Sequence, residues 1–236
     1  MTNATVAIRR AALVLGIAAT CLLNACGTAA QVTEGSAARV QSPPMPAEKP
    51  APEKTYAVAD LPSIVLTPAQ VAGWPTAARA DLTGPFTPTT NTSSQENPQP
   101  VASVRAGYRQ TIANPGGPGV NTVRTILELF DNASSAQAAS STTVRAYEKL
   151  GYTQRMDIAA LQLAPDAVAR SGTNVPIAPQ SEKGSAKQAT VFIWRSGNLL
   201  VIQVVAGDSG VTLAGSVKWA QFVGTNAKAH GSVAGA

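Results

Sequence analysis

Two stretches of the chain each contain two segments rich in apolar residues, joined by a turn, and in residues 120–130 the side chains of Val123, Thr125, Leu127 and Leu129 share one face by a period of two. In the first stretch, residues 104–112 and 120–130 flank a turn rich in Gly and Pro. In the second, residues 189–195 and 199–205 flank the short loop Ser196-Gly197-Asn198, whose residues tolerate positive φ. A period of two places every second side chain on one face of a sheet. We therefore predict two β-hairpins.

Each predicted hairpin is followed by a segment with helical signals. Asp131-Asn132 precede residues 133–149 after the first hairpin, and Asp208-Ser209 precede residues 210–226 after the second. Asp, Asn and Ser are favoured helix N-caps, so both segments are predicted to be helices. Two successive hairpin-helix units predict an α+β fold, an antiparallel sheet with helices packed on one face. Whether the two units arose by an internal duplication stays open.

The remaining segments show weaker patterns. Thr67, followed by Pro and then Gln70, has the spacing of a capping box and predicts a short helix there. Residues 75–103 are polar and poor in apolar anchors, which predicts a long loop. We expect one strand near residues 161–163 and a loop over residues 175–187.

An uncharged apolar run lies near the N-terminus, after Arg9 and Arg10 and before the sequence Leu23-Asn24-Ala25-Cys26. At about 13 residues the run is shorter than the ~20 that span a bilayer, and it is typical of a signal peptide. The sequence 23–26 resembles the lipobox of bacterial, actinobacterial-type secreted lipoproteins. The resemblance implies a diacylglycerol on the Cys26 sulfur and cleavage after Ala25. An ordinary signal peptide, cut nearby, is the alternative.

The signal and the changes in composition divide the chain. Gly27 to about Lys54 is rich in Pro and Ala, which favours an extended tether that buries little apolar surface; a Pro-rich ligand for a partner domain is the alternative. The predicted divisions are a lipoprotein signal peptide over 1–25, the lipidated Cys and tether over 26–55, a single α+β domain over 56–228 and a flexible tail over 229–236.

This organisation predicts a protein of the cell envelope, lipid-anchored to the cell membrane on its extracytoplasmic face by acyl chains such as palmitate. The membrane is thus an expected partner, through the lipid on Cys26. The choice between inner and outer membrane stays open.

Charge and cysteine content narrow the chemistry. The 236 residues include 18 Lys and Arg against 13 Asp and Glu, with both signs interleaved, so we expect no nucleic-acid partner. Cys21 and Cys26 both lie in the N-terminal segment, which leaves the predicted domain without disulfides or Cys-based metal or redox chemistry. The single histidine, His230, lies in the predicted tail. We expect no metal site and no cofactor.

One tetrapeptide and a few carboxylates are candidates for a catalytic role. Residues 207–210, Gly-Asp-Ser-Gly, match the sequence around the nucleophile of trypsin-like serine proteases, but the only histidine lies near the end of the chain. A serine nucleophile needs a positioned base, so we interpret Asp208 and Ser209 as a helix cap. No spacing marks an acid and a base among the carboxylates Asp157, Asp166, Glu128 and Asp131. No catalytic residue is predicted.

Large aromatic residues are few, and each is expected to anchor the core: Trp74, Tyr108, Trp194 and Trp219. In the alternative interpretation, Trp74 or Trp194 lines a ligand pocket, with the long loop 75–103 as its lid.

Residues 194–201, Trp-Arg-Ser-Gly-Asn-Leu-Leu-Val, followed by a helix bearing Ala and Val, resemble a pattern in the extracellular sensor domains of bacterial Ser/Thr kinases and related actinobacterial lipoproteins. The resemblance implies a hairpin that leads into a hydrophobic strand and a last helix. The disulfide cysteines common in those sensor domains are absent from this sequence, and the resemblance assigns no ligand-binding residue.

Two classes of function follow. The first is a non-catalytic binding or sensor-like domain, held at the membrane, for an envelope protein, a cell-wall fragment or a small apolar ligand. The second is an exported hydrolase-like enzyme that uses carboxylates. The anchor, the tether and the lack of a catalytic constellation favour the first class.

Overall fold

A computed structural model describes residues 53–72, 74, 77–78, 83–86, 104–114, 119–177, 185–208 and 210–233. The predicted signal peptide, Cys26 and most of the predicted tether lie outside these residues, so the domain boundaries at that end stay a prediction. None of the helices in the described part is both long enough and apolar enough to cross a membrane.

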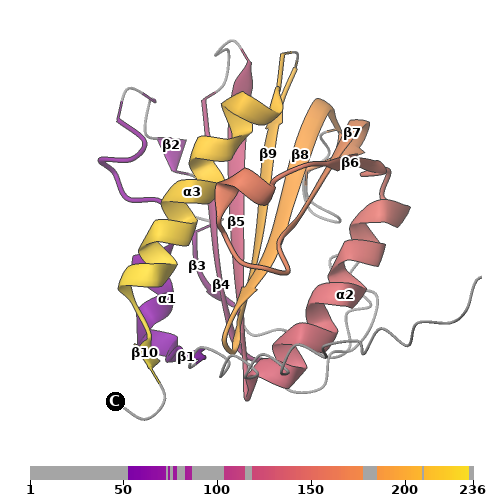
Figure 1. Ribbon diagram of the computed structural model, residues 1–236. Helices are drawn as coiled ribbons and strands as arrows, with labels where there is room; N and C mark the ends of the chain where they lie inside the picture. The colour runs from indigo at the N-terminus through magenta and orange to yellow at the C-terminus, as the bar shows by residue number, and fades with distance from the viewer. Residues whose placement is uncertain are drawn as a thin grey trace, which may run out of the picture. The chain divides into compact units, whose positions relative to one another are not determined.

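An eight-stranded antiparallel sheet forms the centre of the fold (Figure 1). Its strand order is β2-β4-β5-β9-β8-β7-β6, and β3 also pairs with β4. The two predicted hairpins are β4–β5 and β8–β9, and they meet where β5 pairs with β9. The strands are β2 (Ala77–Ala78), β3 (Gly84–Phe86), β4 (Val104–Ala113), β5 (Val120–Phe130), β6 (Gln154–Met156), β7 (Val168–Pro176), β8 (Ser185–Ser196) and β9 (Leu199–Gly207).

Three α-helices pack on the sheet: α1 (Leu61–Ile64), α2 (Ala133–Lys149) and α3 (Leu213–Ala229). Two short 3-10 turns, η1 (Val58–Asp60) and η3 (Ala159–Leu161), lie in the connections. A separate pair of strands, β1 (Lys54–Thr55) and β10 (Ser232–Val233), joins the two ends of the described chain. The α+β class, the antiparallel sheet and the two hairpin-helix units are confirmed.

The helices do not share one face of the sheet, as predicted, but cover both. On β5, Leu127 and Leu129 belong to the hydrophobic cluster that includes Trp219 of α3, whereas Ile126 and Phe130 belong to a second cluster with α2. Figure 1 shows α3 and α2 on opposite sides of the central strands. The physical reason lies in β9, where all nine residues are buried. A strand that is apolar on both faces needs a covering layer on each.

Helix α2 begins and ends as predicted, but α3 starts later. Asn132 caps α2 because its side chain accepts a hydrogen bond from the Ser135 amide, at 2.8 Å. The cap of α3 is Thr212, whose hydroxyl accepts from the Gly215 amide at 3.1 Å, and not Asp208-Ser209. Residues 210–212 intervene because the Val211 amide is held by the Gln188 side chain, at 3.0 Å. Ser209 itself lies outside the described residues.

Several connections differ from their predictions, some of them because strand pairing with β4 and β8 extends the sheet. The Thr67–Gln70 capping box forms, with the Thr67 amide 2.9 Å from the Gln70 side-chain oxygen, but it closes a turn instead of a helix. Strands β2 and β3 lie within the predicted loop 75–103. Residues 161–163 are not a strand, since η3 ends there, and β7 and β8 extend into the predicted loop 175–187.

The predicted tail is also partly ordered. Helix α3 continues to Ala229, and β10 pairs with β1, with Thr55 opposite Ser232. The pairing supplies backbone partners that the tail sequence lacks locally. Residues 229–233 are therefore part of the fold, as are Lys54 and Thr55 at the end of the predicted tether.

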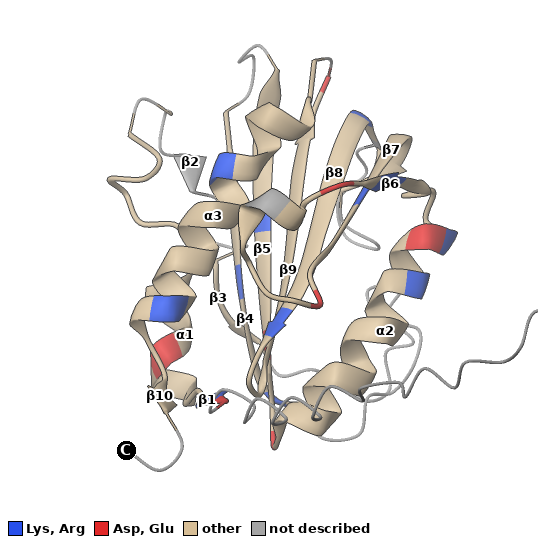
Figure 2. Ribbon diagram, viewed as in Figure 1, with Lys and Arg blue, Asp and Glu red and all other residues tan. Residues whose placement is uncertain are grey.

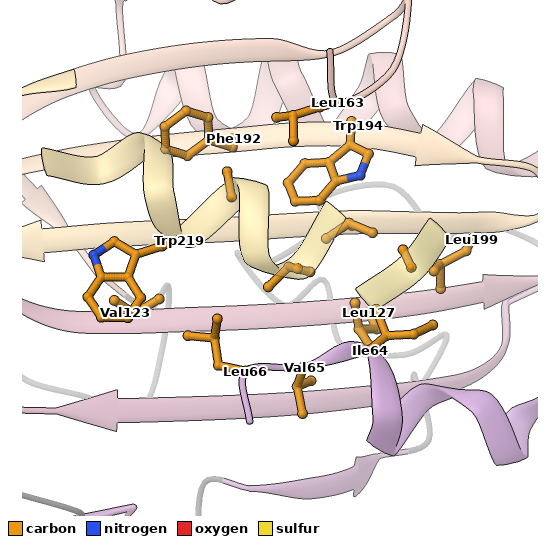
Figure 3. Close-up of a cluster of buried hydrophobic side chains, with 14 of the residues drawn as sticks. Ile64, Val65, Leu66, Val123, Leu127, Leu163, Phe192, Trp194, Leu199 and Trp219 are labelled. Carbon is orange, nitrogen blue, oxygen red and sulfur yellow. The ribbon is translucent and has the colours of Figure 1, made fainter. Parts of the chain in front are cut away.

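The cluster on the α3 side of the sheet holds the largest side chains of the core (Figure 3). Trp194 of β8 and Trp219 of α3 lie at separate places along this core, with 1% and 2% of their surfaces exposed. Burial of one large apolar side chain stabilises a fold by roughly 1.5–3 kcal/mol. The end of the core at Trp194 borders the candidate site.

Candidate binding site at Trp194

A hollow of about 430 Å³ lies beside Trp194 at the end of β8. Leu163 and Pro165, from the loop that joins β6 to β7, form one side, and Gly224 and Ala227 of α3 form another. These side chains are apolar or small. The hollow therefore has an apolar base, open on one side, of the kind that receives a small ligand or an apolar side chain of a partner.

The third side is the N-terminal strap, which we define as Glu53–Tyr56. Two side chains hold it against the β8–β9 turn. Asn198 accepts a hydrogen bond from the Tyr56 amide at 2.8 Å and donates to the Tyr56 and Phe130 carbonyls at 3.2 and 3.0 Å. The Tyr56 hydroxyl donates to the Ala227 carbonyl at 2.9 Å and lies 2.7 Å from the Ser196 hydroxyl. Burial raises the pKa of the Tyr56 phenol, which keeps this donor protonated.

Gly197 lets the strap pass close to the turn. Its φ of 55° is in the left-handed region, and a Cβ at this position would overlap the carbonyl oxygen of Lys54. The loop sequence 196–198 predicts residues with positive φ, and Gly197 has a positive φ. The close approach of a distant segment was not visible in that pattern.

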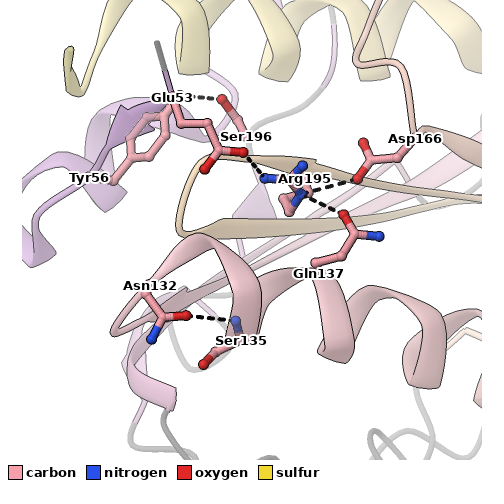
Figure 4. Close-up of polar contacts among 8 residues, drawn as sticks. All are labelled: Glu53, Tyr56, Asn132, Ser135, Gln137, Asp166, Arg195 and Ser196. Atoms are coloured by element: carbon pink, nitrogen blue, oxygen red, sulfur yellow. Dashed lines mark hydrogen bonds and ion pairs between the residues drawn. The ribbon is translucent and has the colours of Figure 1, made fainter. Parts of the chain in front are cut away.

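Charged groups form the rim, and they bond to one another (Figure 4). The Arg195 guanidinium donates to Glu53 at 2.8 Å, to Asp166 at 3.2 Å and to Gln137 at 2.8 Å. The hydrogen bond with Glu53 is the main cause that raises the pKa of Arg195, so the group stays a cation. Arg195 thus joins the strap, the β6–β7 loop and α2 at one point.

The lysines of the rim are bonded to backbone. Lys54 donates to the carbonyls of His230, at 3.0 Å, and of Lys228. Lys228 donates to the Gln162 carbonyl at 2.9 Å. Because these polar groups bond to one another and to backbone carbonyls, the rim holds the walls of the hollow together.

Of the two predicted pocket residues, Trp194 lines this hollow and Trp74 does not. The Trp74 ring packs edge-on against Trp219, with centroids 4.9 Å apart. Tyr108 packs against the same core. Glu53, Lys228 and Asn198 were not predicted, because they reach the site through contacts between residues far apart in sequence. Cys26, the predicted lipidation residue, lies outside the described residues.

The four candidate carboxylates have structural partners or are buried. The Asp157 side chain accepts from the Ala159 amide at 3.0 Å, and Asp166 pairs with Arg195. Asp131 lies 3.5 Å from Arg105, and Glu128 is buried. In the described part of the chain, no three His, Cys, Asp or Glu side chains gather in a way that would hold a metal ion.

No protein-family model and no curated protein sequence matches this chain. Among solved structures, the extracellular domain of PknH from Mycobacterium tuberculosis is similar, with a TM-score of 0.47 and 13% sequence identity. The match covers 75% of this chain and 99% of that chain. A likeness at this level transfers no functional residue.

Proposed function

We propose that this protein is a lipoprotein of the bacterial envelope, anchored to the cell membrane through acylated Cys26. Its domain lies on the extracytoplasmic face and binds a small apolar molecule or an envelope protein, without catalysing a reaction. The N-terminal motif 23–26 and the Pro-rich segment that follows support the anchor.

The hollow at Trp194 is the observation that carries the binding function. Its base is apolar, its rim is held by hydrogen bonds, and one wall is the strap, which includes the last residues of the proposed tether. Ligand recognition of this kind needs a preformed apolar surface with a few fixed polar groups around it. The site therefore lies where the anchored chain enters the domain.

The anchor is tested by metabolic labelling with an alkyne fatty acid, followed by detergent-phase partitioning. We expect the wild-type chain to be labelled and to enter the detergent phase. Cys26→Ala removes both properties, whereas the matched variant Cys21→Ala keeps them, since Cys21 lies in the segment that is cleaved. A labelled Cys26→Ala chain, or an unlabelled wild type, contradicts the proposal.

Binding is tested by native mass spectrometry of the protein purified from a bacterial host. A discrete extra mass that organic solvent removes is the expected result for a small ligand. Trp194→Phe reduces the ligand-bound fraction because it alters the base of the hollow, and Trp74→Phe, the matched change in the same core, leaves it unchanged. If equal losses follow both changes, the ligand does not bind at Trp194. If the measured mass is that of the protein alone, the binding partner is sought among envelope proteins by crosslinking the anchored chain.

A further inference from the structure

Positive and negative charges on the rim of the Trp194 hollow are not balanced. Two carboxylates line it, Glu53 and Asp166, and both lie against the Arg195 guanidinium, at 2.8 and 3.2 Å. Two lysines also line it, so that three cations face two anions. Because both carboxylates are held by the arginine, the surplus positive charge lies with the lysines.

These two lysines, Lys54 and Lys228, bond to backbone carbonyls and form no ion pair within the described segments. Lys54 bonds the carbonyls of Lys228 and His230, and Lys228 bonds that of Gln162. A carbonyl carries only a partial negative charge, so these bonds orient the ammonium groups without neutralising them. Each ammonium also has more N–H groups than these bonds use.

Helix α3 supplies no counter-charge to its own lysine. It contains Lys218 and Lys228 and no acidic residue, as the colours in Figure 2 show. The Lys228 side chain reaches from α3 to the β6–β7 loop, where it bonds Gln162 at 2.9 Å. Its ammonium therefore lies between the helix wall and the loop wall, where a ligand in the hollow would end.

The apolar base lies on the same side of the sheet as these lysines. Leu163, Trp194 and Ala227 belong to one hydrophobic cluster, the cluster packed under α3, and Lys228 directly follows Ala227 on that helix. Gly224 lets the loop come close, because a Cβ there would lie 2.9 Å from the Leu163 side chain. A ligand can thus contact the apolar base and the lysines together.

We propose that the Trp194 hollow binds a single-chain carboxylic acid, with its carboxylate at Lys54 and Lys228 and its chain against Leu163, Trp194 and Ala227. A carboxylate carries one negative charge and matches the surplus, whereas a phosphate monoester carries more and an alcohol none. The volume, about 430 Å³, is small for a ligand pocket and favours one short chain over a two-chain lipid. The inference rests on the binding function proposed above and adds the charge and class of the ligand.

The test uses the full chain, purified from its bacterial host in phosphatidylcholine nanodiscs, with empty nanodiscs as the blank. Titration calorimetry compares octanoate with octanol and octylamine, which share its chain length and differ in the charge of the head. Hydrogen exchange of residues 161–166 and 224–230 locates the bound molecule. We expect octanoate to bind about tenfold more tightly than octanol, with slowed exchange in these two segments, and octylamine to show no saturable binding.

Two variants separate the lysine site from general charge attraction. Lys228→Gln is expected to weaken octanoate binding by about tenfold and to leave octanol binding within about twofold, because only the carboxylate uses the ammonium. Lys187→Gln removes the same charge from an exposed position on β8 that does not line the hollow, and it leaves both affinities within about twofold. Thermal unfolding shows that the variants fold, and Lys54→Gln repeats the test at the other rim lysine.

Three results overturn the inference, and they differ in what they say of the proposed function. If octanoate and octanol bind equally at the hollow, the site takes apolar ligands without regard to charge, and the proposed binding function stands. If Lys228→Gln weakens octanol as much as octanoate, or Lys187→Gln weakens octanoate as much as Lys228→Gln, Lys228 serves only to hold the wall. If neither octanoate nor octanol binds, small-ligand binding at Trp194 loses its support as well.

Discussion

At the scale of single residues, Asn198 connects three parts of the chain. Its side chain bonds the backbone of Tyr56 and of Phe130 while its own backbone makes the β8–β9 turn. Only 4% of the residue is exposed. Its polar partners are therefore shielded from water, which could otherwise replace it as a hydrogen-bond partner.

Asn198→Ala is expected to lower the free energy of unfolding by about 2–4 kcal/mol, because it leaves an amide and two carbonyls without these bonds. Urea unfolding measures the loss. The matched change Asn121→Ala removes a 3.4 Å contact with Asp208 and a 3.1 Å hydrogen bond from the Thr122 hydroxyl, at a half-buried position, and should cost less than about 1 kcal/mol. Equal losses would show that the strap is not held through Asn198.

At the scale of elements, the start of α3 distinguishes a cap from a sequence that merely resembles one. Asp208 and Ser209 have favourable residue types, yet the helix begins five residues after Asp208, where Thr212 meets the Gly215 amide. The intervening residues connect the end of β9 to the helix. Capping needs the side-chain oxygen at the first turn, and residue type alone does not place it there.

Thr212→Ala should therefore destabilise the protein by about 1 kcal/mol, the typical value for a lost N-cap. Asp208→Ala should have an effect below about 0.5 kcal/mol, since Asp208 is exposed and lies outside the helix. Thermal and urea unfolding of the two variants make the comparison. A larger loss for Asp208→Ala would place the functional cap at Asp208 and contradict the assignment of Thr212.

At the scale of the whole molecule, the two ends of the described chain are held together. Strand β1 pairs with β10, and Lys54 donates to the carbonyls of Lys228 and His230 at the end of α3. Arg195 adds the β6–β7 loop to the same end through Asp166. The wall of the Trp194 hollow thus depends on contacts between the first and last described segments.

A disulfide between Thr55→Cys and Ser232→Cys tests that closure, in a chain with Cys21 and Cys26 changed to Ser. The two positions are opposite in the β1–β10 register, and both are exposed. Closing so long a loop should stabilise the oxidised form over the reduced form by about 4 kcal/mol, measured by urea unfolding. Failure of the bond to form under mild oxidation would show that β1 and β10 do not pair in solution.

The sequence by itself determined the elements whose signals are local. Alternation over residues 120–130 identified the first hairpin and the loop 196–198 between two apolar segments identified the second, while Asn132 with the residues after it identified α2, because strand faces, turns and helix caps depend on near neighbours. The sequence of β9, apolar except for Gln203, also contained the evidence that both faces of the sheet are covered, although the helices were predicted on one face. Trp194 is a core residue that borders a hollow, and its role in binding a ligand stays a prediction.

Only the tertiary structure determined which segments distant in sequence contact one another. It brought Glu53 to Arg195, Asn198 to Tyr56 and Trp74 to Trp219, and it placed Arg155 opposite Arg170. Each of these contacts depends on strand order, register or the path of a connection, which no periodicity records. The walls of the Trp194 hollow have the same origin, because they come from segments that meet only when the sheet is complete.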